Sequence, residues 1–229
     1  MSIQVIGGGL AGCEAAWQIA NRGIPVTLYE MKPEKKSPAH RSAGYAELVC
    51  SNSLKAARVE SAAGMLKQEM RMLHSLLMEC ADACIVPAGG ALAVDREQFS
   101  QAVTQKIEEH PNITVIHEEV VHIPNEGVTV IATGPLTADR LAQEIETRFG
   151  GALRFFDAAA PIVTAESIDF SHAFLASRYG RGEGDYINCP MDKAQYEAFY
   201  TQLVAAQRAP LHDFDTDNPK VYEGCMPIE

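Results

Sequence analysis

The residues best suited to chemistry in this sequence form a glycine-rich turn. Gly7 allows a tight turn after an apolar strand, Gly9 leaves room for a pyrophosphate against the backbone, and Gly12 lets a helix pack close to that strand. The N-terminus of this helix would offer free N–H groups and a partial positive charge to phosphates. The residues that we expect to contact a dinucleotide here are Gly7, Gly8, Gly9, Leu10, Ala11 and Gly12.

An acidic residue, Glu30, ends the next apolar stretch, at the spacing from the glycine turn that dinucleotide-binding folds use. A carboxylate there can accept hydrogen bonds from ribose hydroxyls, and it would repel a 2′-phosphate. The sequence therefore predicts FAD or NAD(H), rather than NADP(H), at this site. The less specific interpretation is a βαβ unit whose glycines only make a turn, but three successive glycines are more than a turn needs.

Six cysteines are scattered along the chain, and no two of them form a C-x-x-C pair. Because Ile3 already begins the first strand, no export signal is expected, and we predict free thiols in a reducing cytoplasm. Cys80 and Cys84 should be packing residues, since no histidine or further cysteine stands near them to complete a metal site, and no metal is predicted. The six are Cys13, Cys50, Cys80, Cys84, Cys189 and Cys225.

Cys50 is followed by three residues that commonly cap helices, Ser51, Asn52 and Ser53. We therefore expect a helix to begin after it, and a thiol just before a helix N-terminus has a lowered pKa. A buried, inert cysteine is the alternative, and the spacing does not choose between the two.

The elements that would position these residues alternate between strand and helix. Strands are predicted over residues 3–6, 24–30, 113–116, 119–123 and 128–136. Helices are predicted over residues 13–22, 65–84, 96–109 and 137–148. Asp95 should cap the third helix, and the methionines of the second should lie in the core. This order predicts an α/β fold, with a Rossmann-type domain over residues 1–151 that contains a helical insertion.

After Gly150 the sequence changes in character. Residues 157–163 have the pattern of a linker and a new strand, residues 178–186 are glycine-rich and predicted to be flexible, and residues 194–207 have a helical pattern. The sequence then stops in mid-pattern. We expect residues 152–229 to be part of a second, α+β domain that is truncated.

The formal net charge of −11 provides no general field for nucleic acid, so an RNA partner would have to meet a local basic patch or a region outside this chain. The most basic stretch, residues 31–41, is predicted to be a solvated loop, with a phosphate or RNA contact as the alternative. The longest apolar stretch, residues 85–94, is interrupted by Pro87 and two glycines and is too short to span a bilayer. No membrane association is expected.

Six segments together resemble the folate- and flavin-dependent tRNA methyltransferases that form ribothymidine, the small Gid family. The glycine turn and the Ala-Thr-Gly sequence after the last predicted strand are shared by many flavoproteins, whereas the segments around Cys50 and Cys225 are more specific. The matching segments, in the order of the family, are residues 7–12 with Glu14, residues 47–54, 87–96, 132–134, 185–191 and 223–229.

The resemblance implies FAD as the cofactor of the Rossmann-type domain. It further implies 5,10-methylenetetrahydrofolate as carbon donor, NAD(P)H as reductant and a T-loop uridine of tRNA as acceptor. Cys225 would be the nucleophile that attacks C6 of the uridine, and Cys50 a second thiol beside the flavin, although the reverse assignment stays open. The residues implied to contact FAD are Gly7–Gly12, Glu30, Met31, Lys32, Val121, Thr133 and Gly134.

Two other functions remain open on the sequence. One is an FAD-dependent NAD(P)H oxidoreductase without RNA chemistry, in which Cys50 and Cys225 have redox or packing roles. The other is a truncated, non-catalytic module that binds FAD. Reduction of the flavin by NAD(P)H without methyl transfer to tRNA would favour the oxidoreductase. FAD binding without NAD(P)H turnover would favour the non-catalytic module.

Overall fold

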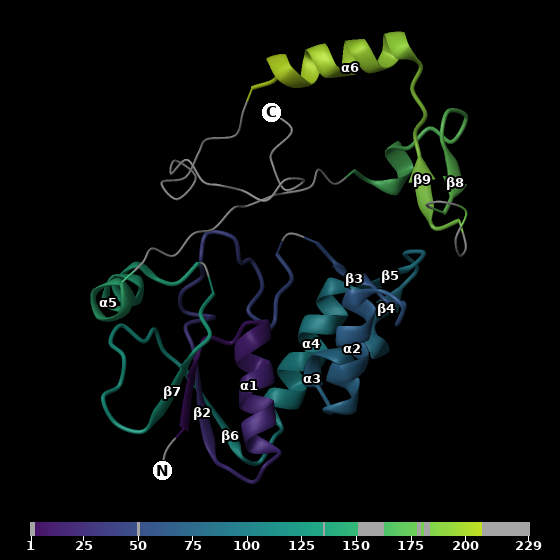
Figure 1. Ribbon diagram of the computed structural model, residues 1–229. Coiled ribbons are helices and arrows are strands. Elements are labelled where there is room, and N and C mark those ends of the chain that lie inside the picture. Colours follow the sequence, from purple (N-terminus) through teal and green to yellow (C-terminus); the bar gives the residue numbers. More distant parts are fainter. Residues whose placement is uncertain are drawn as a thin grey trace. The chain divides into compact units, whose positions relative to one another are not determined.

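The computed structural model describes residues 3–49, 51–134, 136–150, 163–177, 180 and 184–207 (Figure 1). The chain divides into two compact units, Met1–Arg154 and Phe155–Glu229. Both cysteines of the implied catalytic pair, Cys50 and Cys225, lie outside the described residues.

The first unit is built on a parallel sheet of four strands in the order β6-β2-β1-β7. The strands are β1 (Ile3–Ile6), β2 (Val26–Glu30), β6 (Ile113–His117) and β7 (Val128–Ile131). All three pairings are parallel, with Ile6 beside both Tyr29 and Ile131. The carboxyl ends of β1, β2 and β7 therefore meet at one edge, where open α/β sheets bind ligands. The predicted α/β, Rossmann-type fold class is confirmed.

Helices cover both faces of this sheet. Successive residues of a strand point to opposite faces, and Val5 packs in the main core while Ile6 packs against Leu141. The main core also holds apolar residues of α1 (Leu10–Ala20), α3 (Leu76–Ala83) and α4 (Arg96–Glu108). Leu141 belongs to α5 (Asp139–Phe149), which Figure 1 shows on the side of the sheet away from α1.

Trp17, on α1, packs edge-on against His110, with their ring centroids 5.2 Å apart. The Lys106 ammonium lies 5.7 Å from the centroid of the tryptophan ring. These contacts join α1 to α4 and to the residues just after it.

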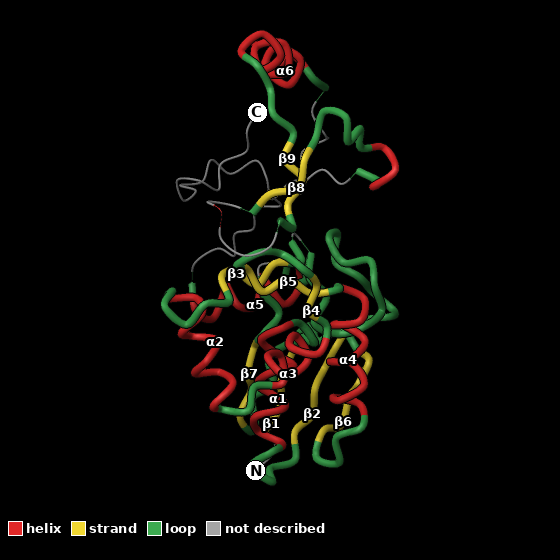
Figure 2. The backbone as a smooth tube through the Cα atoms, turned by 90° about the vertical axis from the view of Figure 1, so that its right-hand side faces the viewer, coloured by secondary structure: helices red, strands yellow, loops and turns green. Residues whose placement is uncertain are grey.

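An insertion between β2 and β6 carries a small antiparallel sheet in the order β3-β5-β4. Figures 1 and 2 both place it on the side toward which the parallel strands run. Its elements are β3 (Ser53–Ala56), α2 (Ala62–Met72), α3, β4 (Ile85–Val86), β5 (Ala91–Val94) and α4. As predicted, Asp95 caps α4, because its carboxylate accepts hydrogen bonds from the amides of Glu97 and Gln98, each at 3.0 Å.

The prediction of a helix after Cys50 is wrong, because residues 53–56 form β3. Ser53 pairs with Ala93, and the backbone N–H of Val94 donates to the carbonyl oxygen of Asn52 at 3.0 Å. The Asn52 side chain supports this strand pairing instead of capping a helix, because its amide group donates to the Val94 carbonyl oxygen at 3.1 Å. The expected lowering of the Cys50 pKa by a helix that begins at these residues therefore loses its basis.

The predicted long helix over residues 65–84 is two helices, α2 and α3. His74, with φ of +56°, breaks it, and Ser75 caps α3 by accepting a hydrogen bond from the Met78 amide. Cys80 and Cys84 are buried, as predicted. The prediction that the methionine stripe is core is wrong for Met65, which is 52% exposed, and Leu66 beside it is 57% exposed.

The predicted strand over residues 119–123 is absent: β6 ends at His117, and these residues form a loop. The Ile123 amide donates to the Glu144 carboxylate on α5, at 3.0 Å, rather than to a neighbouring strand. Val121, implied as a cofactor contact, lies half-buried in this loop.

The described part of the second unit contains a two-stranded antiparallel sheet and a helix. The strands are β8 (Phe174–Ala176) and β9 (Tyr186–Asn188), and the helix α6 (Lys193–Ala205) confirms the helix predicted near residues 194–207. A 3-10 turn, η1, spans Ala165–Ser167. Residues 157–162, and most of the glycine-rich stretch over residues 178–183, lie outside the described residues. Within the described residues, no helix has both the length and the apolar character that a membrane span requires.

Candidate functional site

The glycine turn after β1 packs directly against neighbouring backbone. Gly7 adopts φ of +104° and donates its N–H to the Tyr29 carbonyl oxygen at 2.8 Å. A Cβ atom on Gly7 would lie 2.8 Å from the Ala132 carbonyl oxygen, and one on Gly12 would lie 1.8 Å from the Gly7 carbonyl oxygen. Only glycine fits at these two positions, because the turn, α1 and the end of β7 approach one another without side chains between them.

Gly9 differs from these two glycines, because a Cβ atom added to it would meet nothing within 4 Å. It is the N-cap residue of α1 and makes no side-chain cap, and the first turn of α1 has no acidic residue. Among the described residues, no acceptor takes a hydrogen bond from the amides of Leu10 or Ala11. The N-terminus of α1 therefore opens onto free space with unpaired N–H groups, which is the arrangement that a phosphate requires.

Glu30, at the end of β2, is only 6% exposed, and its carboxylate binds backbone amides. One oxygen accepts from the Gly8 N–H at 2.6 Å, and the other accepts from the Lys32 N–H at 2.9 Å. The carboxylate thus fixes the glycine turn against the segment after β2. Each carboxylate oxygen has a second lone pair, so these bonds are compatible with the predicted ribose contact.

The segment after Glu30 is a loop with many exposed residues, as predicted, but two of its residues are buried. Lys32 is 4% exposed; its ammonium donates to the Gly44 carbonyl oxygen and lies 4.0 Å from the Glu47 carboxylate. Ser37 is also buried, whereas Lys35 and Lys36 are exposed, as predicted. The proline and charge pattern identifies a loop but does not reveal that its first cation is enclosed by residues 44–47.

Tyr45 belongs to no sequence motif, yet its segment lies against the glycine turn. The Ala46 N–H donates to the Gly8 carbonyl oxygen at 2.9 Å, and Ser100 donates to the Tyr45 carbonyl oxygen at 2.6 Å. The Tyr45 ring is buried and stacks on His117, with centroids 6.3 Å apart. Burial, and then Glu108, raises the pKa of the Tyr45 hydroxyl. In the sequence, the only sign that Tyr45 packs against the turn is its position between two small residues, Gly44 and Ala46.

The end of β7 completes the edge of the sheet. A Cβ atom on Gly7 would lie 3.0 Å from the Thr133 Cα atom, and Gly134 has φ of +67°. The Thr137 hydroxyl donates to the Gly134 carbonyl oxygen at 2.7 Å and so holds the loop before α5. The structure therefore brings the glycine turn, Glu30 and Thr133 to one edge.

The three buried cysteines of the first unit, Cys13, Cys80 and Cys84, are not reactive thiols. The Cys13 thiol is buried and donates to the Gly8 carbonyl oxygen at 3.3 Å, and burial, then Glu30, raises its pKa to about 12. Burial raises the pKa of Cys80 to about 11. Both thiols stay protonated at neutral pH, so catalytic roles would fall to other cysteines. No cluster of metal-ligating side chains occurs in the described ranges.

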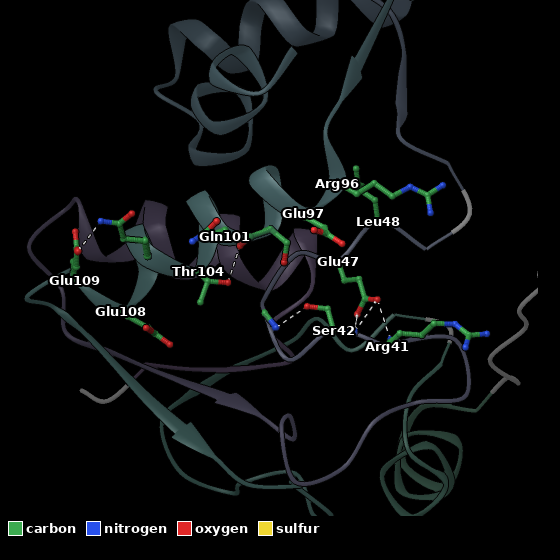
Figure 3. A pocket seen from close by; sticks show the side chains of 13 residues that line it. Arg41, Ser42, Glu47, Leu48, Arg96, Glu97, Gln101, Thr104, Glu108 and Glu109 are labelled. Carbon is green, nitrogen blue, oxygen red and sulfur yellow. Dashed lines mark hydrogen bonds between the residues drawn. The ribbon is translucent and has the colours of Figure 1, made fainter. Parts of the chain in front are cut away.

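A polar pocket of about 920 Å³ lies between the loop at residues 41–48 and α4 (Figure 3). Figure 3 shows Arg41 and Arg96 toward one end and Glu108 and Glu109 toward the other. Glu47 accepts from the Arg41 backbone N–H at 2.9 Å. Because both signs of charge line it, this pocket is not a uniform basic surface for RNA.

Comparison with known proteins adds evidence independent of the geometry. The family described as "Glucose inhibited division protein A" matches residues 2–229. A methylenetetrahydrofolate–tRNA-(uracil-5-)-methyltransferase TrmFO of Acetivibrio thermocellus is 61% identical over 99% of this chain and 52% of its own length. The protein of the same name from Ligilactobacillus salivarius is 58% identical over 100% of this chain and 52% of its own length.

The chain thus spans about half the length of the curated relatives it matches. Among solved structures, one of GidA from Aquifex aeolicus superposes with a TM-score of 0.43 at 20% identity, over 54% of this chain and 21% of that one.

Proposed function

The chain belongs to the Glucose inhibited division protein A family, and on that premise we propose that it binds FAD and serves the folate-dependent methylation of uracil C5 in tRNA. The observation that carries the proposal is the identity of 61% with a relative whose name states that reaction. The carbon donor is 5,10-methylenetetrahydrofolate, the acceptor is a T-loop uridine, and NAD(P)H reduces the flavin. A tRNA substrate and free thiols suit the cytoplasm.

The residues at the edge of the sheet fit a flavin dinucleotide. The open space at Gly9 and the unpaired amides of Leu10 and Ala11 suit its diphosphate. Glu30 suits a ribose, and Thr133 and Gly134 offer close backbone at the end of β7. Met31 and Lys32 would contribute their backbone, since the Lys32 ammonium is already bound by Gly44. When bound, reduced flavin supplies the hydride that converts a transferred methylene group into a methyl group.

The uridine requires a nucleophile, because C5 of uracil does not attack carbon unaided. In the proposal, the Cys225 thiolate adds to C6, which makes C5 nucleophilic, and Cys50 serves as a second thiol close to the reacting base. C5 would then bond to the methylene carbon that the folate donates and lose its proton. Addition of a hydride to that carbon and departure of the thiolate from C6 would complete the methyl group and restore the C5–C6 double bond.

Cofactor binding is tested by the visible absorbance of the purified chain before and after denaturation. We expect about one equivalent of released FAD, as the Rossmann fingerprint predicts. A colourless chain that also fails to take up added FAD would contradict the cofactor assignment.

The role of Cys225 is tested by covalent capture of a T-loop RNA hairpin that carries 5-fluorouridine, seen as a band on a denaturing gel. We expect capture by the chain and by a Cys189→Ala control, and none by Cys225→Ala. Capture by Cys225→Ala would show that another thiol attacks, and Cys50→Ala would then be compared.

The two experiments together also test the alternative of a non-catalytic module that binds FAD, which the match to only half of the relatives' length favours. If the chain holds FAD but does not capture RNA, it functions as a cofactor-binding module, and the methyl transfer belongs to longer proteins.

A further inference from the structure

The insertion contains a second pocket, of about 490 Å³, beside the glycine turn. Leu10, the first residue of α1, lines it together with residues of β3, α2 and α3 and with Phe99 of α4. Its lining is apolar apart from two lysines, Lys55 and Lys67. The pocket therefore shares a residue with the proposed diphosphate site and extends from it over the insertion.

Lys67 is enclosed, although lysine is among the residues that are least often buried. It is 7% exposed, and its ammonium donates to the carbonyl oxygens of Ala56 at 3.2 Å and Ala63 at 3.0 Å. Among the described residues, no carboxylate lies within ion-pair distance of it. Burial, followed by Arg71 and Lys55, lowers its pKa.

The packing of α2 explains why a lysine faces inward. A Cβ atom on Gly64 would lie 1.7 Å from the Arg58 carbonyl oxygen, so this glycine turns one face of α2 toward the chain around β3. Lys67, three residues later, shares that face, while the adjacent Met65 and Leu66 are exposed. Lys67 thus lies on the inward face of α2, a position that an apolar residue occupies in an ordinary surface helix.

A buried ammonium without a counter-ion is costly, and an apolar residue would fill the same space without that cost. Two of the three N–H donors of Lys67 are used by carbonyl oxygens, which leaves one donor and the uncompensated charge. A ligand that brings a negative charge into the pocket would supply both the missing acceptor and the counter-charge.

We propose that this pocket binds an anionic group of an aromatic ligand, with Lys67 as the residue that pairs with the anion and the apolar lining as the surface for the ring. The inference rests on the proposed function for the identity of the ligand. Two ligands of the proposed function combine an aromatic ring with an anion. FAD has a diphosphate, and folate has the glutamate carboxylates attached to its aminobenzoyl ring.

The test compares the chain with Lys67→Met and with Lys193→Met, a control that removes the same charge from exposed α6. Isothermal titration calorimetry is run separately with FAD and with p-aminobenzoylglutamate, and thermal unfolding is followed for each variant. A lost charge-assisted hydrogen bond predicts at least about a tenfold weaker dissociation constant for Lys67→Met. Its melting temperature should be unchanged or higher, because methionine removes a buried charge.

A loss of affinity for FAD alone identifies the diphosphate as the anion, and a loss for p-aminobenzoylglutamate alone identifies the folate carboxylates; either result supports the proposal. If both ligands bind Lys67→Met as tightly as they bind Lys193→Met, or if only the melting temperature falls, Lys67 is structural and the proposal is overturned. A chain that binds FAD through α1 but shows no effect of Lys67 overturns this inference and leaves the proposed function standing.

Discussion

At the scale of single residues, the glycines of the turn have two different roles, packing within the protein and leaving space for a ligand. Gly7 and Gly12 are required by contacts within the protein, since a Cβ atom on either would lie 2.8 Å or less from backbone oxygen. Gly9 is not required by any such contact, and its φ of −75° is accessible to every residue. The freedom at Gly9 concerns a ligand rather than the fold.

Gly9→Asp should therefore separate stability from cofactor binding. Aspartate is a favourable N-cap, so the free energy of unfolding should stay the same or rise by a few tenths of a kcal/mol. Its charge would occupy the α1 amides and repel a diphosphate, so FAD content should fall to near zero. Gly90→Asp adds the same charge at another open position and should keep FAD. Retention of FAD by Gly9→Asp would place the diphosphate elsewhere.

The buried thiol of Cys13 makes the free energy of unfolding fall as the pH rises into the alkaline range. The pKa of Cys13 is about 12 in the fold and 9.0 for an ordinary thiol, so the unfolded chain releases this proton first as the pH rises. Stability from Cys13 is complete below pH 9 and is lost toward pH 12, with a slope of up to about 1.4 kcal/mol per pH unit. Urea unfolding of Cys13→Ala should show a shallower decline than that of Cys189→Ala. Equal declines would contradict this origin.

At the scale of elements, α4 depends on its cap. Asp95 accepts hydrogen bonds from two amides of the first turn, so Asp95→Ala should lower the free energy of unfolding by about 1 kcal/mol. Asp139 lies in the first turn of α5 but is not its N-cap residue, so Asp139→Ala should change stability by less than about 0.5 kcal/mol. Denaturant unfolding measures both, and equal effects would argue that only the helix dipole is involved.

Elements whose signals are local could be predicted from the sequence. The first strand, turn and helix, the cap of α4 and the apolar strand β7 all depend on neighbours within a few residues. The segment at residues 53–56 could not, because its capping residues favour a helix locally while pairing with β5, far along the chain, makes it a strand.

The same limit applies to the candidate site. The fingerprint identifies the glycine turn and Glu30, whose partners follow from the fold. Lys32 is enclosed by the Gly44 carbonyl oxygen of a loop, and Lys67 by the Ala56 carbonyl oxygen at the end of β3. The charge pattern of the sequence does not report either contact. The alternation of apolar residues around Val121 predicts a strand, whereas in the structure these residues form a loop that Glu144 of α5 holds through the Ile123 amide.

At the scale of the whole molecule, the described candidate contacts for FAD all belong to the first unit, Met1–Arg154. A fragment of residues 1–154 should therefore bind FAD with the same dissociation constant as the full chain, measured by fluorescence titration. A much weaker fragment would show that residues beyond 154 contribute to the cofactor site. Because the net charge of the chain is −11, any contact with tRNA must be local, and added salt should weaken it.

The single tryptophan gives this protein a built-in optical reporter. Trp17 is the only tryptophan of the chain and lies on α1, the helix whose N-terminus we propose to meet the cofactor. Its emission therefore describes the state of that helix without any label, and a flavin bound nearby would quench it by energy transfer. Binding, unfolding and the effect of each variant can be followed on one sample through one signal.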